Sequence, residues 1–292
     1  MTGSCGLGAD PLTGMVRWPD GKQLAIFVNI AFEAWSPGVA PGVSPMGNPL
    51  PPGLPDTASE SWGRFGYRRG IWRLLDTLER LGTPATVMVS GLLTELAPDA
   101  VRAVVSGGHE ICGHGWAQEQ LPANVTEDAE AAMIDHCLGA LAGAGAEVSG
   151  WISPRCTPSP VTFELLRDRG LSWTGDVFDD DRPYLLPGAG RPLVALPLTM
   201  ETNDLPLVMK HGHTPDSFRE TFTDTVLAAL DSAHAPLHLD ITAHSHVTGR
   251  VGMAAAFEAA IADAQSDPRV WIGTRGQASR LVLARNPAEA TR

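Results

Sequence analysis

The sequence predicts an α/β fold in which parallel strands, covered by outer helices, close or nearly close into a barrel. Two observations lead to this prediction. Apolar runs of strand length alternate along the chain with segments whose apolar residues recur at helical spacing, and glycines end several of the helical segments. Repeated strand–helix units favour a parallel sheet. The length of 292 residues suits one domain of barrel size better than two separate cores.

The first half of the chain begins with LAIFVNIAF (24–32), a continuous apolar run typical of a strand buried on both faces. The segment RRGIWRLLDTLERLG is predicted to be a helix that ends at Gly82. Its apolar positions follow the helical i, i+3, i+4, i+7 pattern: Ile71, Leu74, Leu75 and Leu78. A strand at PATVMVSG (84–91), a helix at PDAVRAVVSGG, a strand near His109–Cys112 and a helix across Glu127–Leu141 follow.

The alternation continues through the second half. We expect strands at VSGWIS, LSWTGDVF, VALPLT, PLHLDITAH and RVWIGT. Between them, helices are expected at SPVTFELLRDRG, at the segment with Phe218, Phe222, Val226 and Leu230 on one face, at GMAAAFEAAIADA and at the end of the chain. The predicted organisation is therefore one barrel domain over residues 20–286, with an N-terminal extension at 1–19 and a C-terminal tail at 287–292.

One insertion interrupts this pattern. The segment SPGVAPGVSPMGNPLPPGLPDTASESWGRF (36–65) is so rich in proline and glycine that we predict neither a helix nor a central strand within it. A structureless insertion of this length is usually functional or disordered. It could be a flexible surface loop. We favour a lid over the strand ends across residues 36–66, because proline stiffens the segment and Trp35 and Trp62 bracket it.

Composition excludes several classes of protein. The formal net charge of -12 disfavours nucleic acid and anionic membranes as partners. No apolar run approaches about 18 residues and no apolar signal-peptide core stands near the start, which predicts neither a membrane span nor a signal peptide. The four cysteines, Cys5, Cys112, Cys137 and Cys156, show no C-x-x-C spacing, so neither a thiolate metal site nor a disulfide framework is expected. These features are typical of a cytoplasmic protein.

Polar residues collect where predicted strands end. They are Glu33, His114, Arg155, Asp176, Thr202, Asn203, Asp204, His244 and His246. In a parallel barrel the carboxyl ends of the strands share one face, where active sites are built. A carboxylate and a histidine, such as Glu33 and His244, can act as general base and general acid in a hydrolysis. Neither a serine-nucleophile elbow nor a glycine-rich nucleotide loop is present.

Seven segments together resemble the polysaccharide deacetylase superfamily (carbohydrate esterase family 4), and in particular its allantoinase and cyclic imide hydrolase branch. They are FVNIAFEAW, FGYRRGIWRLL, GHEICGHGW, GWISPR, WTGDVFDDDRPY, PLTMETNDLP and AHSHVTGR. The resemblance covers about residues 20 to 285. It implies a distorted barrel of parallel strands with outer helices. It also implies hydrolysis of a carbon–nitrogen bond by an activated water molecule.

The resemblance implies roles for individual residues. Glu33 would be the base, His114 would help to bind water or polarise the carbonyl group, and His244 would protonate the leaving nitrogen. Arg155 would pair with Asp176 and orient the base. The residues expected to contact the substrate are Trp35, Tyr67, Arg68, Trp116, Asn203, Asp204 and His246. Alternatively, Asn203 and Asp204 could cap a turn, and one or more of the aromatic side chains could serve packing alone.

The resemblance also bears on whether the site holds a metal. Deacetylases of the family carry two adjacent aspartates and two metal-binding histidines four positions apart. Here the matching residues are Glu33-Ala34 and His114 with Gln118. His109 is no substitute, because a separation of five residues does not place it on the same face as His114. We therefore expect either no cofactor or one weakly held, zinc-type divalent metal bound by Glu33, His114 and Gln118.

The sequence thus predicts an amidohydrolase that acts on a non-peptide carbon–nitrogen bond of a small amide, imide or ureide. One alternative is a metal-dependent N-deacetylase of an acetamido sugar or a related N-acyl compound. A second alternative is a catalytically degenerate barrel that binds a small ligand. The expected partner is a small-molecule substrate, and the resemblance implies a homo-oligomer.

Overall fold

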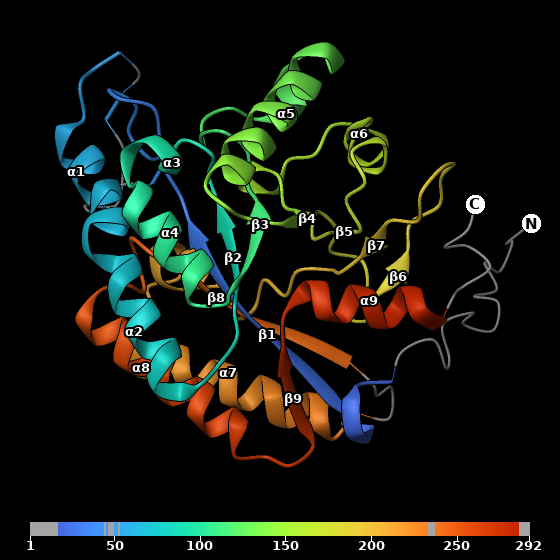
Figure 1. Ribbon diagram of the computed structural model, residues 1–292. Helices are drawn as coiled ribbons and strands as arrows, with labels where there is room; N and C mark the ends of the chain where they lie inside the picture. The colour runs from blue at the N-terminus through green and yellow to red at the C-terminus, as the bar shows by residue number, and fades with distance from the viewer. Residues whose placement is uncertain (1–16, 44, 46–49, 52, 233–236, 286–292) are drawn as a thin grey trace, which may run out of the picture.

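The computed structural model describes residues 17–43, 45, 50–51, 53–232 and 237–285. Most of the predicted N-terminal extension, the predicted C-terminal tail and Cys5 lie outside these residues. The predicted α/β architecture is confirmed: a curled, mostly parallel sheet is surrounded by helices (Figure 1). The strands are β1 (Leu24–Phe32), β2 (Thr86–Val89), β3 (Glu110–Gly113), β4 (Val148–Trp151), β5 (Trp173–Thr174), β6 (Tyr184–Leu185), β7 (Val194–Ala195), β8 (Leu237–His244) and β9 (Val270–Gly273).

Nine α-helices connect or cover these strands within the described residues. They are α1 (Thr57–Phe65), α2 (Ile71–Leu81), α3 (Leu93–Leu96), α4 (Pro98–Ser106), α5 (Glu127–Gly143), α6 (Thr162–Asp168), α7 (Pro215–Leu230), α8 (Val251–Gln265) and α9 (Arg275–Arg285). Two π-helical turns, Gly66–Gly70 and Leu205–Lys210, and short 3-10 turns at Pro19–Gly21, Pro122–Asn124 and Pro154–Cys156 complete the list. No helix in the described part of the chain is long and apolar enough to cross a membrane.

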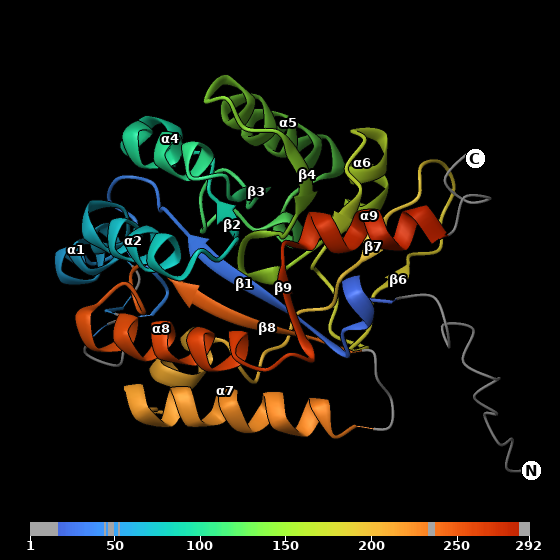
Figure 2. The same ribbon diagram turned by 60° about the horizontal axis from the view of Figure 1, so that its bottom comes forward.

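Strand β1 pairs with three other strands, and all nine of its residues are buried, as its apolar run predicts. Along one edge it pairs with β8, from Leu24 opposite Leu237 to Ala31 opposite His244. Its other edge pairs first with β9 and then with β2. The arrowheads of β1 and β8 point the same way, toward α1 (Figure 2). The residues that follow these two strands therefore meet at the same end of the barrel.

The barrel closes irregularly between β7 and β8. The sheet order is β6-β7-β5-β4-β3-β2-β1-β8, and no regular ladder joins β7 to β8 in the described residues. Instead, the segment after β7 contacts β8: Thr199 N donates to Asp240 Oδ2 (2.8 Å), and Thr242 N donates to the carbonyl oxygen of Thr202 (3.2 Å). The predicted barrel is therefore distorted at this seam, and the seam carries residues 202–204 to the end of β8.

The predicted helices form because their apolar faces cover this sheet. In α2 the buried side chains include Ile71, Leu74 and Leu78, in agreement with the predicted pattern. The helix ends at Gly82, whose φ of 59° is left-handed, a conformation that glycine adopts without a steric penalty. Helix α7 packs against α8, and α8 packs against α2, so that these helices form one continuous outer layer (Figure 2).

The structure differs from the sequence predictions in three places. Residues 57–65 of the insertion form α1, because the prolines end at Pro55 and the Asp56 carboxylate accepts a hydrogen bond from Ser59 N (2.9 Å), which caps the helix. The strands expected at LSWTGDVF and VALPLT are each only two residues long. Strand β6, which was not expected, pairs with β7 in the antiparallel sense.

Candidate active site

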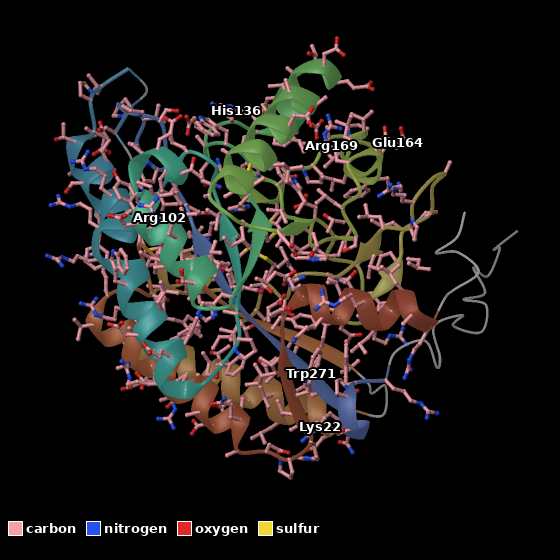
Figure 3. The ribbon with its side chains drawn as sticks, in the orientation of Figure 1. Lys22, Arg102, His136, Glu164, Arg169 and Trp271 are labelled. Carbon is pink, nitrogen blue, oxygen red and sulfur yellow. The ribbon has the colours of Figure 1, made fainter. Side chains whose placement is uncertain are left out.

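Three side chains that follow different strands meet at the carboxyl end of the barrel. Glu33 follows β1, His114 follows β3 and His244 ends β8. The Glu33 Oε1 atom lies 3.4 Å from His114 Nε2 and 3.6 Å from His244 Nε2. The other carboxylate oxygen, Oε2, lies 3.8 Å from His246 Nδ1. Lys22 and Trp271 mark the opposite end of the barrel, where β1 and β9 begin (Figure 3). One carboxylate is thus surrounded by three histidines.

His244 is held by a buried carboxylate. Its Nδ1 atom donates to Asp204 Oδ1 (2.6 Å), and its backbone N–H donates to Asp204 Oδ2 (2.8 Å). The Thr248 hydroxyl group also donates to Asp204 Oδ2 (2.6 Å). These bonds fix the orientation of the imidazole ring. They leave Nε2, with its proton, facing Glu33.

The three ionisable neighbours differ strongly in pKa. Burial raises the pKa of Glu33, but the charge of His244 and the contacts with His114 and His246 outweigh it and hold this pKa at about 2. Burial lowers the pKa of His244, but Asp204 and Glu33 outweigh it and raise this pKa to about 9. Burial lowers the pKa of His246 to about 4, with Glu33 opposing and His244 adding to the effect. At neutral pH the site therefore holds a carboxylate, an imidazolium ion at His244 and a neutral imidazole at His246.

The orientation of His114 determines what fits beside Glu33. Its Nδ1 atom lies 2.6 Å from the carbonyl oxygen of Ile152, and because a carbonyl oxygen only accepts, Nδ1 must donate. In the neutral ring, Nε2 then carries a lone pair that faces the Glu33 carboxylate at 3.4 Å. At this separation no water molecule fits between the two acceptors, but a molecule with two donors that lies beside them can donate one hydrogen bond to each. A water molecule meets this requirement.

The expected pair of Arg155 and Asp176 does not form in the structure. The buried Asp176 carboxylate instead accepts bonds from the Ser153 backbone N–H (2.9 and 3.0 Å) and from the Ser153 hydroxyl group (2.6 Å). Arg155 is exposed, has a left-handed φ of 53° and directs its guanidinium group toward Gly42 of the insertion. The left-handed backbone turns its side chain outward, which sequence order alone does not reveal. Burial raises the pKa of Asp176 to about 6, although the bonds from Ser153 lower it.

The expected aromatic contacts divide into two groups. Trp35 lies beside His246, with ring centroids 5.3 Å apart, and Trp62 of α1 lies closer still, at 4.6 Å. Trp116 instead stacks on His136 of α5 at 3.8 Å. Tyr67 lines a separate cavity of about 160 Å³ together with Trp35. Arg68, on the π-helical turn Gly66–Gly70, is exposed. Of the aromatic side chains expected to contact substrate, Trp35 is therefore found against a histidine of the site, and Trp62 of α1 joins it there.

Two residues expected to bind substrate have other partners. The Asn203 side-chain oxygen accepts a bond from Leu205 N (3.0 Å), which is the turn-capping alternative that the sequence left open. Asp204 is fully buried and holds His244, a role that sequence reasoning missed. Thr248 was missed as well. The only available signal was an aspartate at the end of a strand, and its partner stands 40 residues further along the chain.

The residues at the expected metal position do not fit a divalent metal. The Gln118 amide nitrogen donates to Ser90 Oγ and to the carbonyl oxygen of His114 (3.1 Å each), and Ala34 offers only a methyl group. Across the described residues, no group of three or more histidine, cysteine, aspartate or glutamate side chains is arranged to hold a metal ion. Glu33 and His114 alone fall short of the three protein ligands that a catalytic zinc site uses. His109 lies at the other end of β3, half-buried and distant from His114.

Comparisons with known proteins identify similar sequences and structures. A family model described as polysaccharide deacetylase matches residues 65–171. The fission yeast Schizosaccharomyces pombe has a protein named "Putative polysaccharide deacetylase" that is 26% identical over 254 residues, which cover 79% of this chain and 78% of that protein. The matched segments include the helices and strands that place His114 in the site.

Two solved structures resemble the whole barrel. A probable polysaccharide deacetylase of Pseudomonas aeruginosa PAO1 is 28% identical with a TM-score of 0.85, and the match covers 92% of this chain and 94% of that one. The PuuE allantoinase is 27% identical with a TM-score of 0.84, and the match covers 92% and 93% of the two chains. The sequence match over residues 65–171, the shared barrel and the motif residues gathered at one end of it lead to the same conclusion: the chain is similar to the polysaccharide deacetylase family.

Proposed function

We propose that this protein hydrolyses a non-peptide carbon–nitrogen bond in a small amide, imide or ureide. The observation that carries the proposal is the position of Glu33 Oε1, within 3.6 Å of the Nε2 atoms of both His114 and His244. A base and an acid are thereby placed beside one potential water site. The similarity to an allantoinase, a ureide hydrolase, supports this choice of bond.

The reaction follows from the protonation states. A water molecule donates one hydrogen bond to Glu33 and one to His114 Nε2, and both orient it toward the substrate carbonyl carbon. Glu33 takes a proton as the new carbon–oxygen bond forms. His244 then gives its Nε2 proton to the nitrogen as the carbon–nitrogen bond breaks, and the leaving group departs as a neutral amine or amide. Transfer of the proton on Glu33 back to His244, through solvent, restores the site.

The low pKa of Glu33 does not prevent it from acting as a base. A carboxylate with a pKa of about 2 is a weak base, and catalysis favours a pKa closer to the working pH. The positive charge of His244 is the largest contribution that lowers it. Once Glu33 has taken up a proton, its own negative charge disappears, which lowers the pKa of His244 and promotes the second transfer. The first proton transfer therefore assists the second.

The first test uses purified variants and a panel of small substrates: hydantoin, allantoin, succinimide and glutarimide. We expect the Glu33→Gln and His244→Ala variants to lose roughly 10²-fold or more in kcat, which is the usual contribution of a positioned acid or base. The control is His211→Ala, an exposed histidine outside the site. If both site variants kept full activity, the assignment of base and acid would be wrong.

A metal-dependent N-deacetylase is the second candidate. It is supported by the polysaccharide deacetylase family model and by the deacetylase name of the Pseudomonas relative. The residues around Glu33 argue against this candidate, because they do not supply the protein ligands that a catalytic zinc site uses. Deacetylation of N-acetylglucosamine oligomers that a chelator abolishes and zinc restores would favour this candidate. Hydrolysis of the small panel at the same rate with and without chelator would favour the amidohydrolase.

A further inference from the structure

The outer surface of the barrel carries a groove between α2 and α4, which lie side by side in the helical layer (Figure 1). The groove has a volume of about 650 Å³, and its lining includes Leu75 and Leu78 of α2, Ala103 of α4 and Trp72. All eight tryptophans of the chain are described, and Trp72 alone is exposed (39%), whereas the others are buried or half-buried. An exposed indole beside a groove with apolar walls is typical of an interaction surface.

The carboxylates of this groove have no charged partner in the described part of the molecule. Asp76 and Glu79 of α2 line the groove, are exposed and form no ion pair there. Glu79 lies in the last turn of α2, where the helix dipole disfavours an anion. Arg80, the basic residue of that turn, pairs with Glu258 of α8 instead (Nη2 to Oε2, 2.6 Å). Burial lowers the pKa of His109, which also lines the groove, so this side chain adds no positive charge at neutral pH.

Exposed arginines stand at the other end of the same helical face. Arg68 and Arg69 lie on the π-helical turn Gly66–Gly70 that leads into α2, and neither is in an ion pair within the described residues. Four exposed residues are separated by three, four and three positions, a spacing that places them on one side of a helix: Arg69, Trp72, Asp76 and Glu79. This face is therefore positive before Trp72 and negative after it.

The order of these charges selects the partner. A basic partner would be attracted by Asp76 but repelled by Arg69, and an acidic partner would meet the reverse. A second copy of α2 that runs antiparallel to the first satisfies both ends. With a two-fold axis beside Trp72, Arg69 of each copy lies opposite the partner's Asp76, because the two positions are equally far from the axis. Local pairing of this kind also offsets the repulsion between two chains that each carry a net charge of -12.

We propose that α2 and the groove beside it form a two-fold interface between two copies of this chain. The indole of Trp72 from each copy lies at the centre, against the apolar side chains of the partner's groove, and two pairs of Arg69 with Asp76 flank the indoles. Tryptophan and arginine side chains carry much of the binding energy of such interfaces. The inference is independent of the proposed hydrolysis. It goes beyond the expected homo-oligomer because it names the surface, the symmetry and the residues that form the contact.

Sedimentation equilibrium over a range of concentrations of the full chain measures the association. We expect the wild-type protein to dimerise and Trp72→Ala to raise the Kd of the dimer about 10-fold or more, because the change removes one indole from each copy. The matched control is Leu227→Ala, which shortens an apolar side chain that is 51% exposed on α7, outside this groove. It should leave the Kd within about threefold of the wild-type value. A wild-type protein that stays monomeric, or a dimer that Trp72→Ala leaves unchanged, would overturn the proposal.

Charge reversal tests the antiparallel order of the contact. Arg69→Glu makes both ends of the face acidic and Asp76→Arg makes both ends basic, so we expect each variant alone to dimerise about 10-fold or more weakly than the wild-type protein. An equimolar mixture of the two variants should form a heterodimer, because each acidic end then faces a basic one. The double variant that carries both changes in one chain should again form a homodimer for the same reason. Both side chains are exposed and outside any ion pair in the described residues, so folding is preserved, which circular dichroism checks. A mixture and a double variant that both stay monomeric would overturn the two-fold pairing.

Discussion

At the scale of single residues, two histidines two positions apart are held in opposite charge states. His244 has a carboxylate on each side, and its pKa rises to about 9. His246 has two indole rings beside it and no hydrogen-bonded carboxylate, and its pKa falls to about 4. Different environments thus assign different roles to identical side chains, a common way in which a site separates its acid from its other groups.

The pH dependence of activity follows from these pKa values. Glu33 must be ionised, which holds above a pH of about 2, and His244 must be protonated, which holds below a pH of about 9. We therefore expect activity between a pH of about 2 and a pH of about 9, and we expect it to be lost as the pH rises through the pKa of His244. Asp204→Asn removes one of the two charges that raise this pKa. We expect the alkaline limb of the kcat/KM profile to move to lower pH by about one unit or more.

The profile is measured by initial rates over the full alkaline range, with Asp135→Asn as the matched control. Asp135 is an exposed carboxylate that pairs with Arg169 on the outer surface. Its removal should leave the profile unchanged. An alkaline limb at the same pH in Asp204→Asn and in the wild-type protein would show that His244 is not the proton donor.

The sequence predicts which polar residues share the barrel face, but it does not predict all of their partners. Glu33, His114 and His244 follow strands that can be recognised from apolar runs, so their convergence is foreseeable. Arg155 and Asp176 also follow strands. However, the left-handed backbone at Arg155 turns its side chain outward, and the Asp176 carboxylate accepts hydrogen bonds from Ser153. Contacts of this kind depend on local dihedral angles and on side-chain distances, which spacing along the chain does not determine.

At the scale of elements, close backbone packing positions the turn that carries the two histidines. The π-helical turn Gly66–Gly70 lies against residues 245–249, and a β-carbon at Gly70 would lie 1.8 Å from the carbonyl oxygen of Ser245. A β-carbon at Gly249 would lie 2.2 Å from the same atom. π-Helical turns are rare and occur frequently at functional sites. Only glycine permits this approach between the π-helical turn and the residues that follow β8.

Gly70→Ala should therefore be costly. Because the clash involves backbone atoms, the turn must shift, and we expect the free energy of unfolding to fall by about 3 kcal/mol or more. The matched control is Gly139→Ala in α5, where a β-carbon would meet nothing within 4 Å. That change should raise the free energy of unfolding by up to about 1 kcal/mol. Urea unfolding measures both, and equal effects of the two changes would contradict the packing argument.

Helices and strands are predicted correctly where the apolar pattern extends over many residues. They are predicted poorly where tertiary contacts determine how long an element is. Strand β1 and helix α2 have clear patterns and form as predicted. Strands β5 and β7 are short because the chain leaves the sheet to build the seam with β8. Helix α1 was not predicted, because the prolines that precede it led to the prediction that the whole insertion lacks a helix. Its capping residue, Asp56, is a local signal that was available.

At the scale of the whole molecule, a buried ion pair joins two elements near the C-terminus, and its arginine also reaches β1 near the N-terminus. Arg275, the first residue of α9, and Asp240 of β8 are both fully buried, with Nη2 and Oδ1 2.5 Å apart. The guanidinium group also donates to the carbonyl oxygen of Leu196 (2.6 Å) and to Asn29 Oδ1 of β1 (3.3 Å). One side chain therefore links α9, β1, β8 and the segment after β7, where the sheet lacks a regular ladder.

This arrangement predicts a large effect for Arg275→Met. The change leaves the Asp240 carboxylate buried without its cation, and removal of one partner from a buried pair costs about 3–5 kcal/mol. The control is Arg219→Ala, which breaks a pair with Asp263 whose side chains are 47% and 43% exposed. That change should cost less than about 1 kcal/mol. Urea unfolding of both variants gives the comparison.

The double variant Arg275→Met with Asp240→Leu determines the cause of that loss. If the cost arises from an unpaired buried charge, removal of the second charge should recover part of the stability, because an apolar pair of similar volume is tolerated in its place. Asp240 also accepts bonds from Asn29 and from Thr199 N, so the recovery should be incomplete. A double variant less stable than Arg275→Met alone would show instead that Asp240 stabilises the seam mainly through those bonds. The closure of the barrel between β7 and β8 would then depend on hydrogen bonding more than on charge.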